Sequence, residues 1–260
     1  MQRRLWMLTG LSAMVILAAF FLPPITQPSD YHQFADQRIF FSIPDFFNVI
    51  SNLAIFISGL TGLWFLVRLS RSSVRNQVFI ETAECWPYWI LFLSVVMAGV
   101  GSIYYHWSPD NDGLVWDRIP IALGIMALLS AVLTERIGAQ VGMWSLPFLT
   151  VLGVASVVYW YWTERVGVGS LNFYVVSQFY SILLILLLSM LFPSRYTRGT
   201  DIYQVVALYA VAKLTEVLDA EIYSWGQIIS GHTIKHLLVA LAVYWIVRTL
   251  QKRRPLQERI

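Results

Sequence analysis

The chain has 260 residues, of which 57% are hydrophobic and only 13% are charged, and its formal net charge is +3. Soluble globular domains carry about 25% charged residues, so this composition argues against a soluble protein and predicts one embedded in a membrane. No block of Lys and Arg is interleaved with aromatic residues, so we expect no nucleic-acid partner. The chain has one cysteine, Cys85, so it cannot form an intrachain disulfide.

Apolar runs of about 20 residues predict membrane-spanning helices, and eight such runs follow one another along the chain. They cover residues 5–23, 46–67, 87–106, 115–134, 143–162, 170–192, 202–219 and 233–250. The run at 202–219 is the weakest, because charged residues interrupt it. The connections are short and contain no Gly/Ser linker. We therefore predict an all-α fold, a polytopic transmembrane helix bundle that forms one domain.

The first run begins after Gln2-Arg3-Arg4, which is similar to the basic start of a signal peptide. It ends at Phe20-Phe21-Leu22-Pro23-Pro24, with no small-x-small cleavage site. We therefore expect an uncleaved anchor helix that lies in the lipid bilayer.

The distribution of Lys and Arg predicts the orientation, because cytoplasmic loops are enriched in them. With the N-terminus in the cytoplasm, 13 of the 18 Lys and Arg residues fall on the cytoplasmic side. Both termini are then cytoplasmic. The 13 residues are Arg3, Arg4, Arg68, Arg71, Arg75, Arg136, Arg195, Arg198, Arg248, Lys252, Arg253, Arg254 and Arg259.

Three of the four histidines fall at the predicted outer ends of helices. His232 and His236 are four residues apart, so they share one helix face and have the spacing by which a helix offers two imidazoles to one metal ion. His106 supplies a third ligand if its helix packs against theirs. Three protein ligands and one water form a catalytic zinc site. The alternative is that these are interfacial side chains with no ligand role and that the H-x-x-x-H pair arose by chance.

Two candidate catalytic residues accompany the histidines. Ser102 lies four residues before His106 on the same face, and Asp117 is expected to open the next helix after the loop 107–116. A carboxylate there could orient or deprotonate a metal-bound water, and a hydroxyl could hydrogen-bond that water or a developing oxyanion. Polar groups at membrane depth are candidates for functional residues by default.

Two further polar clusters are candidate supporting residues. Asp45, Asn48 and Asn52 share a helix face, with Ser51 beside them. They provide either interhelical hydrogen bonds or direct contacts with substrate or metal.

Lys213, Glu216 and Asp219 form a stripe at a spacing of three on the run 202–219. Lys213 and Glu216 either form a structural ion pair or, with Asp219, line a polar wall that receives a lipid head group.

Three separated motifs resemble the alkaline ceramidase family, within the wider superfamily of seven-helix membrane hydrolases that includes the adiponectin-receptor-like proteins. Pro44-Asp45-Phe46-Phe47-Asn48-Val49-Ile50-Ser51-Asn52 is similar to the family's acid-aromatic-x-Asn-x-x-Ser-Asn segment. Gly101-Ser102-x-x-x-His106, followed by Asp117 and Pro120, is the second motif, and His232-x-x-x-His236 is the third. Their order and spacing agree with the family over roughly residues 36–250, as in a divergent, bacterial member.

The resemblance implies a zinc-dependent intramembrane hydrolase of a lipid amide, such as a ceramide or another N-acyl sphingolipid. His106, His232 and His236 would hold zinc, and a zinc-bound water would attack the amide carbonyl with the help of Asp117 and Ser102. It also implies a seven-helix core over 31–252. Residues 1–30 would add an N-terminal anchor helix and outer loop, and residues 253–260 a cytoplasmic basic tail. The compact loops favour a bacterial plasma membrane, with the site in its outer half.

The resemblance does not extend to calcium. The eukaryotic members carry an acidic, tryptophan-containing calcium motif, whereas Tyr31-His32-Gln33-Phe34-Ala35-Asp36-Gln37-Arg38 stands at the corresponding place. His32 is expected to be a loop residue.

Two other classes of function remain open from the residues themselves. One is a zinc-containing seven-helix receptor or lipid-binding membrane protein without significant turnover. The other is a transporter, which inverted repeats and discontinuous helices would indicate; the sequence has no clear internal repeat.

Overall fold

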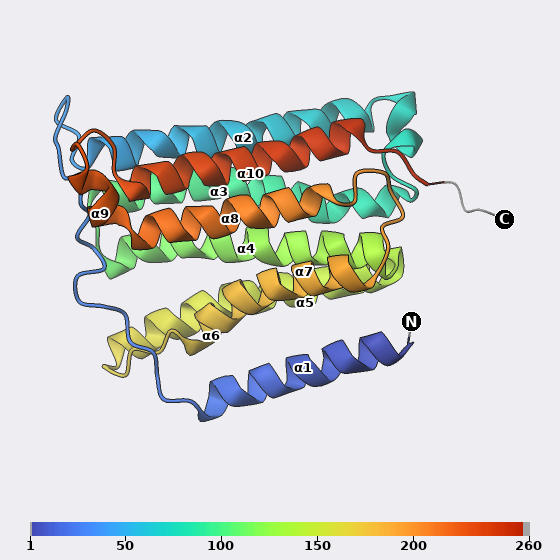
Figure 1. Cartoon of the computed structure of the whole chain (residues 1–260), viewed down its shortest axis with the longest axis horizontal. Helices are drawn as coiled ribbons and strands as arrows, with labels where there is room; N and C mark the ends of the chain where they lie inside the picture. The colour runs from blue at the N-terminus through green and yellow to red at the C-terminus, as the bar shows by residue number, and fades with distance from the viewer. Residues whose placement is uncertain (1, 257–260) are drawn as a thin grey trace.

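The computed structural model describes residues 2–256, and for Ser73 and Arg75 only the backbone. Within this part of the chain the structure is helical and contains no β-strand, only two isolated bridges. The long helices run side by side along the long axis of the molecule (Figure 1). In chain order the elements are α1 (Gln2–Phe21), α2 (Phe46–Ser70), η1 (Ser73–Gln77), η2 (Thr82–Cys85), α3 (Trp86–Trp107), α4 (Asn111–Arg136), α5 (Ala139–Arg165), α6 (Asn172–Val175), η3 (Val176–Tyr180), α7 (Ser181–Leu191), α8 (Asp201–Val217), α9 (Asp219–Ser224) and α10 (Gly231–Lys252).

Seven helical segments of the described chain are long and apolar enough to cross a membrane. They confirm seven of the predicted runs; α6, η3 and α7 together form one of these segments. The eighth predicted run is α8, which has 17 residues and is about 25 Å long at a rise of about 1.5 Å per residue. It packs along α10 within the bundle but is shorter than the seven spanning segments. The protein is therefore an all-α, multi-pass integral membrane protein.

The bundle brings α3 and α4 into very close contact beside two of the predicted site residues. A Cβ atom at Gly101 would lie only 2.1 Å from the carbonyl oxygen of Trp116, so only glycine fits there. This approach places Ser102 of α3 next to Asp117 of α4. On the other side, α2 packs against both α3 and α10.

Helix α1 is set apart from the other helices (Figure 1). Its main contacts are with α6 and η3, and Leu8 is its one buried residue among Gln2–Phe21. The side chain of Asn172 fixes the chain that follows α1, since it accepts a hydrogen bond from the amide of Ile25 at 2.8 Å and donates to the carbonyl of Pro23 at 3.1 Å. An apolar helix with so little burial fits a lipid-facing addition to the bundle.

Two local expectations were wrong. Asp117 does not open its helix: α4 begins at Asn111 because the side chain of Asp110 caps it, accepting from the amide of Gly113 at 2.6 Å. Asp117 therefore lies in the second turn.

Asp219 does not continue the helix of Lys213 and Glu216. Leu218 leaves the helical conformation at φ −93° and ψ 25°, so that α8 ends at Val217 and Asp219 begins α9.

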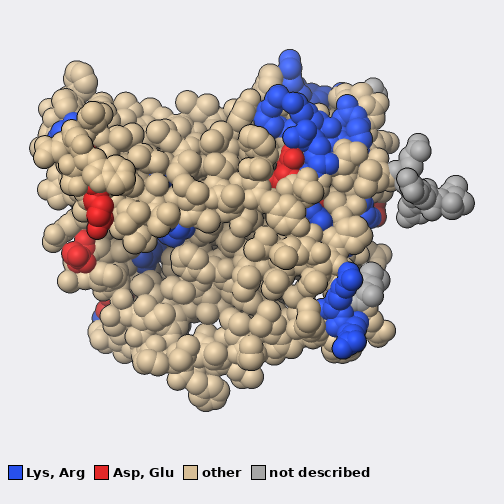
Figure 2. Space-filling model, in the orientation of Figure 1, with Lys and Arg blue, Asp and Glu red and all other residues tan. Residues whose placement is uncertain are grey.

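The two ends of the bundle differ in charge. Lys and Arg gather at the end where both termini lie, whereas the exposed Asp and Glu in this view lie mainly toward the opposite end (Figure 2). The three histidines of interest are near that opposite end, because His106 is in the last turn of α3 and His232 and His236 are in the first turns of α10.

Candidate metal centre

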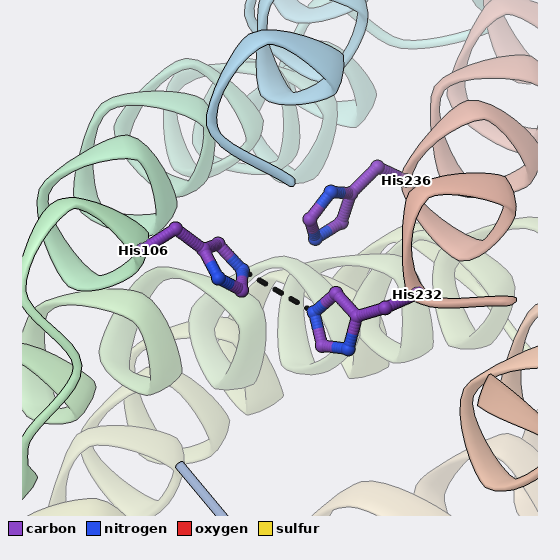
Figure 3. Close-up of side chains that lie close together, drawn as sticks. All are labelled: His106, His232 and His236. Carbon is purple, nitrogen blue, oxygen red and sulfur yellow. Dashed lines mark hydrogen bonds between the residues drawn. The ribbon is translucent and has the colours of Figure 1, made fainter. Parts of the chain in front are cut away.

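His106, His232 and His236 converge in the protein interior (Figure 3). Their side chains belong to α3 and α10, and they are 1%, 8% and 2% exposed. The ring centroids are 4.8 to 5.1 Å apart. Helix α2 packs against both α3 and α10. It therefore holds the two helices close enough for their histidine rings to meet.

The spacing of the ring nitrogens fits a metal ion. One nitrogen from each ring can be chosen so that all three lie within 4.8 Å of one another, and Nε2 of His106 is 3.2 Å from Nε2 of His232. Two nitrogens bound to a tetrahedral zinc at about 2.0–2.1 Å lie roughly 3.3 Å apart. The His106–His232 pair is therefore already at zinc spacing, and the His236 ring would have to move closer to complete a tetrahedral site.

Ser51 fixes the orientation of His236. The hydroxyl of Ser51 donates to the carbonyl of Asn48 at 3.1 Å, and its oxygen lies 2.8 Å from Nδ1 of His236. With the Ser51 proton on the Asn48 carbonyl, Nδ1 of His236 is the donor, and the lone pair lies on Nε2. A ligating histidine in proteins normally has such a partner on its other nitrogen.

Two imidazole nitrogens at this site have no hydrogen-bond partner within the described residues. They are Nε2 of His236 and Nδ1 of His106, and both are buried. Buried polar atoms in native proteins nearly always have partners, so the unpaired Nε2 of His236 fits a ligand at this place. The donor set of three imidazoles suits zinc, among other transition metals.

A strap formed by the connection between α1 and α2 (residues 30–36) covers the centre. The ring of Phe34 packs against His106 and His232, with centroids 4.6 and 4.7 Å away. The strap is fixed by the carboxylate of Asp219, which accepts from the amides of Ala35 at 3.0 Å and of His232 at 2.7 Å. Asp219 therefore positions the backbone on two sides of the centre.

His32 lies in the strap but belongs to another cluster. Its ring nitrogens lie 3.0 Å from the hydroxyl of Tyr105 and 3.1 Å from Oδ1 of Asn111.

The polar residues of α2 join this helix to the start of α10. Oδ1 of Asn48 accepts from the hydroxyl of Thr233 at 3.0 Å, and Nδ2 of Asn52 donates to the carbonyl of Asn48 at 2.7 Å. Both asparagines are fully buried. Asp45 lies just before α2, where its side chain makes no capping hydrogen bond. Burial and, to a smaller degree, the charge of Asp36 raise the pKa of Asp45 to about 6.

Lys213 and Glu216 form an ion pair that sequence reasoning anticipated, and Lys235 joins it. Glu216 accepts from Lys235 at 3.0 Å and also pairs with Lys213. Nζ of Lys235 also lies 2.7 Å from Nε2 of His232. Lys235 is one of the basic residues outside the predicted cytoplasmic side, and its place between two candidate ligands, one residue before His236, was a usable signal.

A cavity of about 180 Å³ reaches one histidine of this centre, His236. Ser102, Asp117 and Lys235 also line it, and the side chains of Ser102 and Asp117 interact with each other. Its polar end thus combines a candidate metal ligand with the carboxylate and hydroxyl that the sequence singled out.

The rest of the cavity is apolar and runs between the helices. Its lining on α10 extends from His236 to Ile246, and on α4 from Asp117 to Leu128. At about 1.5 Å per residue these stretches are about 15 Å long. The other apolar lining residues include Leu91, Val95, Ile182, Val205, Val206 and Val243.

The fold and the centre define a class: a polytopic membrane helix bundle with a buried histidine triad that could hold a metal ion. Comparison with models of known protein families and with curated proteins gives no match. What the protein does must therefore be argued from the centre and the cavity.

Proposed function

We propose that this protein is a zinc-dependent hydrolase that cleaves the amide bond of a membrane lipid. The observation that carries the proposal is that one member of the histidine triad, His236, lines the polar end of a long apolar cavity together with Asp117 and Ser102. An acyl chain in the apolar part would bring its amide group to the triad. The resemblance of the three motifs to the alkaline ceramidase family supports the same chemistry.

Each proposed role follows from where a side chain lies. His106, His232 and His236 would hold zinc, and Ser51 would keep Nε2 of His236 turned toward it. Zinc in such a site polarises a carbonyl and lowers the pKa of water to about 7. Asp117 would accept the proton of the attacking water and pass it to the departing amine, as a general base and then a general acid.

Ser102 serves two partners in this proposal. Its hydroxyl is engaged by Asp117 and lines the cavity, so it would hold that carboxylate in place and donate to the carbonyl oxygen as negative charge develops there. Lys235 adds a positive charge on the opposite wall, where Glu216 holds it.

The proposed setting is a bacterial plasma membrane. The basic end of the bundle (Figure 2) would face the cytoplasm, in agreement with the positive-inside rule. The triad would then lie in the outer half of the bilayer, and the acyl chain would extend toward its middle.

The test is the metal content and activity of purified full-length protein and its His236→Ala variant. We expect equimolar zinc and release of fatty acid from N-acyl lipids in the wild type, and loss of both in the variant. His32→Ala is the matched control, because His32 is a histidine outside the triad; it should keep its zinc and its turnover. Full turnover by His236→Ala without zinc would refute the proposal.

The same experiment separates the hydrolase from a receptor or lipid-binding protein. Wild-type protein that contains zinc but releases no fatty acid from a panel of N-acyl lipids would favour the binding protein.

A further inference from the structure

Arg118 is a buried cation in the wall of the cavity. It follows Asp117 on α4, is 3% exposed, and lines the same cavity as His236. Three aromatic rings surround its guanidinium carbon, with the centroids of Tyr31, Trp160 and Tyr174 at 5.0, 4.1 and 5.0 Å. These rings hold the guanidinium by cation–π contacts.

The donors of Arg118 are only partly used. Its side chain interacts with the hydroxyl of Tyr31, but Nε and Nη1 have no partner within the described residues, and no ion pair of Arg118 occurs there. A charged donor that is buried and unpaired is costly. The geometry therefore leaves a place for an acceptor from a ligand.

The polar end of the cavity has an excess of positive charge. Arg118, Lys213 and Lys235 are the cations that line it, and Asp117 and Glu216 are the carboxylates; three cations and two carboxylates leave a formal charge of +1. Glu216 is shared by Lys213 and Lys235, and Asp117 interacts with Ser102. A divalent metal ion at the triad would increase the excess.

We infer that the lipid amide bound here carries a negatively charged oxygen group, a carboxylate or a phosphate, on its amine portion, and that Arg118 binds this group. The inference rests on the proposed amide hydrolase and specifies its substrate class: N-acyl amino acids or N-acyl amines that bear a phosphate. The free donors Nε and Nη1 lie on different edges of the guanidinium, so either of them can donate a charge-assisted hydrogen bond to one oxygen of such a group. The acyl chain occupies the apolar end, and the amide lies between the chain and Arg118, beside Asp117 and His236.

The test compares three ligands with the same acyl chain: N-oleoylglycine, N-oleoylethanolamine phosphate and neutral N-oleoylethanolamine. Binding to purified full-length protein is measured by displacement of a fluorescent fatty acid. We expect the wild type to bind at least one of the anionic lipids about 10-fold more tightly than the neutral one, as a charge-assisted hydrogen bond of about 1.4 kcal/mol gives. Which anion is preferred identifies the carboxylate or the phosphate.

Arg118→Gln should remove this preference while neutral N-oleoylethanolamine binds as before, and Arg118→Lys should keep part of it. The matched control is Arg68→Gln, because Arg68 also lies over a tryptophan ring, that of Trp64 at 4.2 Å, but does not line the cavity. It should keep the full preference. Equal binding of all three lipids by the wild type, or an unchanged preference in Arg118→Gln, overturns the inference.

The binding experiment is repeated with His236→Ala protein. The displacement assay does not require turnover, so it measures lipid binding separately from hydrolysis. A preference for anionic lipids there, combined with an absence of turnover in the wild type, would contradict the hydrolase but not the anion-binding role of Arg118. Turnover in the wild type without any preference for anionic lipids would contradict only the role of Arg118.

Discussion

Two buried arginines at opposite ends of the bundle have similar surroundings but different partners. Arg253, which follows α10, is 2% exposed, and the rings of Phe79, Tyr88 and Tyr196 surround it at 4.7, 5.3 and 4.1 Å. Arg118 has three rings at similar distances. Arg253, however, pairs with Glu135 at 3.4 Å and donates to the carbonyl of Val78 at 3.0 Å.

The difference distinguishes charged side chains that form ion pairs within the protein from charged side chains that are available to bind a ligand. Protein groups at the Arg253 end form ion pairs, and Glu84 with Arg195 adds another at 2.7 Å. At the other end, within the described residues, Arg118 and Asp45 have no ion pair. Burial and aromatic packing alone therefore do not identify a binding residue; a buried charge that has no ion pair and lines a cavity does.

The largest effect should come from removing Arg253. Arg253→Gln leaves the Glu135 carboxylate paired only with Arg136, at 3.6 Å, and removes the buried cation between the three rings, so we expect a loss of about 3 kcal/mol in the free energy of unfolding. The measurement is thermal or denaturant unfolding in detergent. Arg118→Gln should cost less than about 1 kcal/mol, because it breaks no ion pair. Equal losses in the two variants would remove the distinction between the two ends.

Ser51 provides the next test, because it prepares the triad for a metal. In Ser51→Ala, Nδ1 of His236 loses its partner, and we expect zinc affinity to fall 10- to 100-fold, the usual effect of losing such a contact. Competition with a chelator measures it. Ser58→Ala is the matched control, since Ser58 lies on the same helix and donates to the carbonyl of Ile55 at 2.7 Å without contacting a histidine. Similar affinity in both variants would show that Ser51 does not orient His236.

The smallest effect concerns Asp45. Burial and, to a smaller degree, the nearby charge of Asp36 raise its pKa to about 6. A raised carboxyl pKa stabilises the fold while the group is protonated, below its ordinary value of 3.8, and this contribution is lost as the pH rises through about 6. Each pKa unit corresponds to about 1.4 kcal/mol. Arg38 pairs with Asp36 at 2.7 Å and so offsets the negative charge that Asp45 experiences. We therefore expect a modest effect on stability.

We therefore predict that Asp45→Asn raises the free energy of unfolding by about 1 kcal/mol at pH 8 and leaves it unchanged at pH 4. Asp30→Asn, a change of an exposed acid in the same connection, is the control. A gain at pH 4 as large as at pH 8 would count against the ionisation of Asp45 as the cause.

Much of the fold could be predicted because the bilayer restricts the options. Backbone polar groups inside lipid must bond within their own segment, so each long apolar run becomes a helix; the run at 143–162 corresponds to Ala139–Arg165 in the structure. The meeting of the three histidines was predictable from the spacing of His232 and His236 and from the helix-end position of His106.

The remaining contacts depend on the packing of distant segments. Phe34 reaches the centre, and Tyr31 the cavity, only because the connection after α1 folds over them, which no local pattern indicates. The break at Leu218 was missed because the apolar pattern continues through it. Arg118 is one of the basic residues outside the predicted cytoplasmic side, and an arginine within an apolar run is itself a functional candidate.

The lengthwise orientation of the cavity has a consequence for the products of the proposed reaction. Its apolar part follows α4 and α10 inward from the triad, so the two fragments would depart in opposite directions. The fatty acid would be left among the lipid tails and diffuse sideways within its leaflet. The small charged amine would escape to the aqueous phase, and this physical separation would favour cleavage over its reversal.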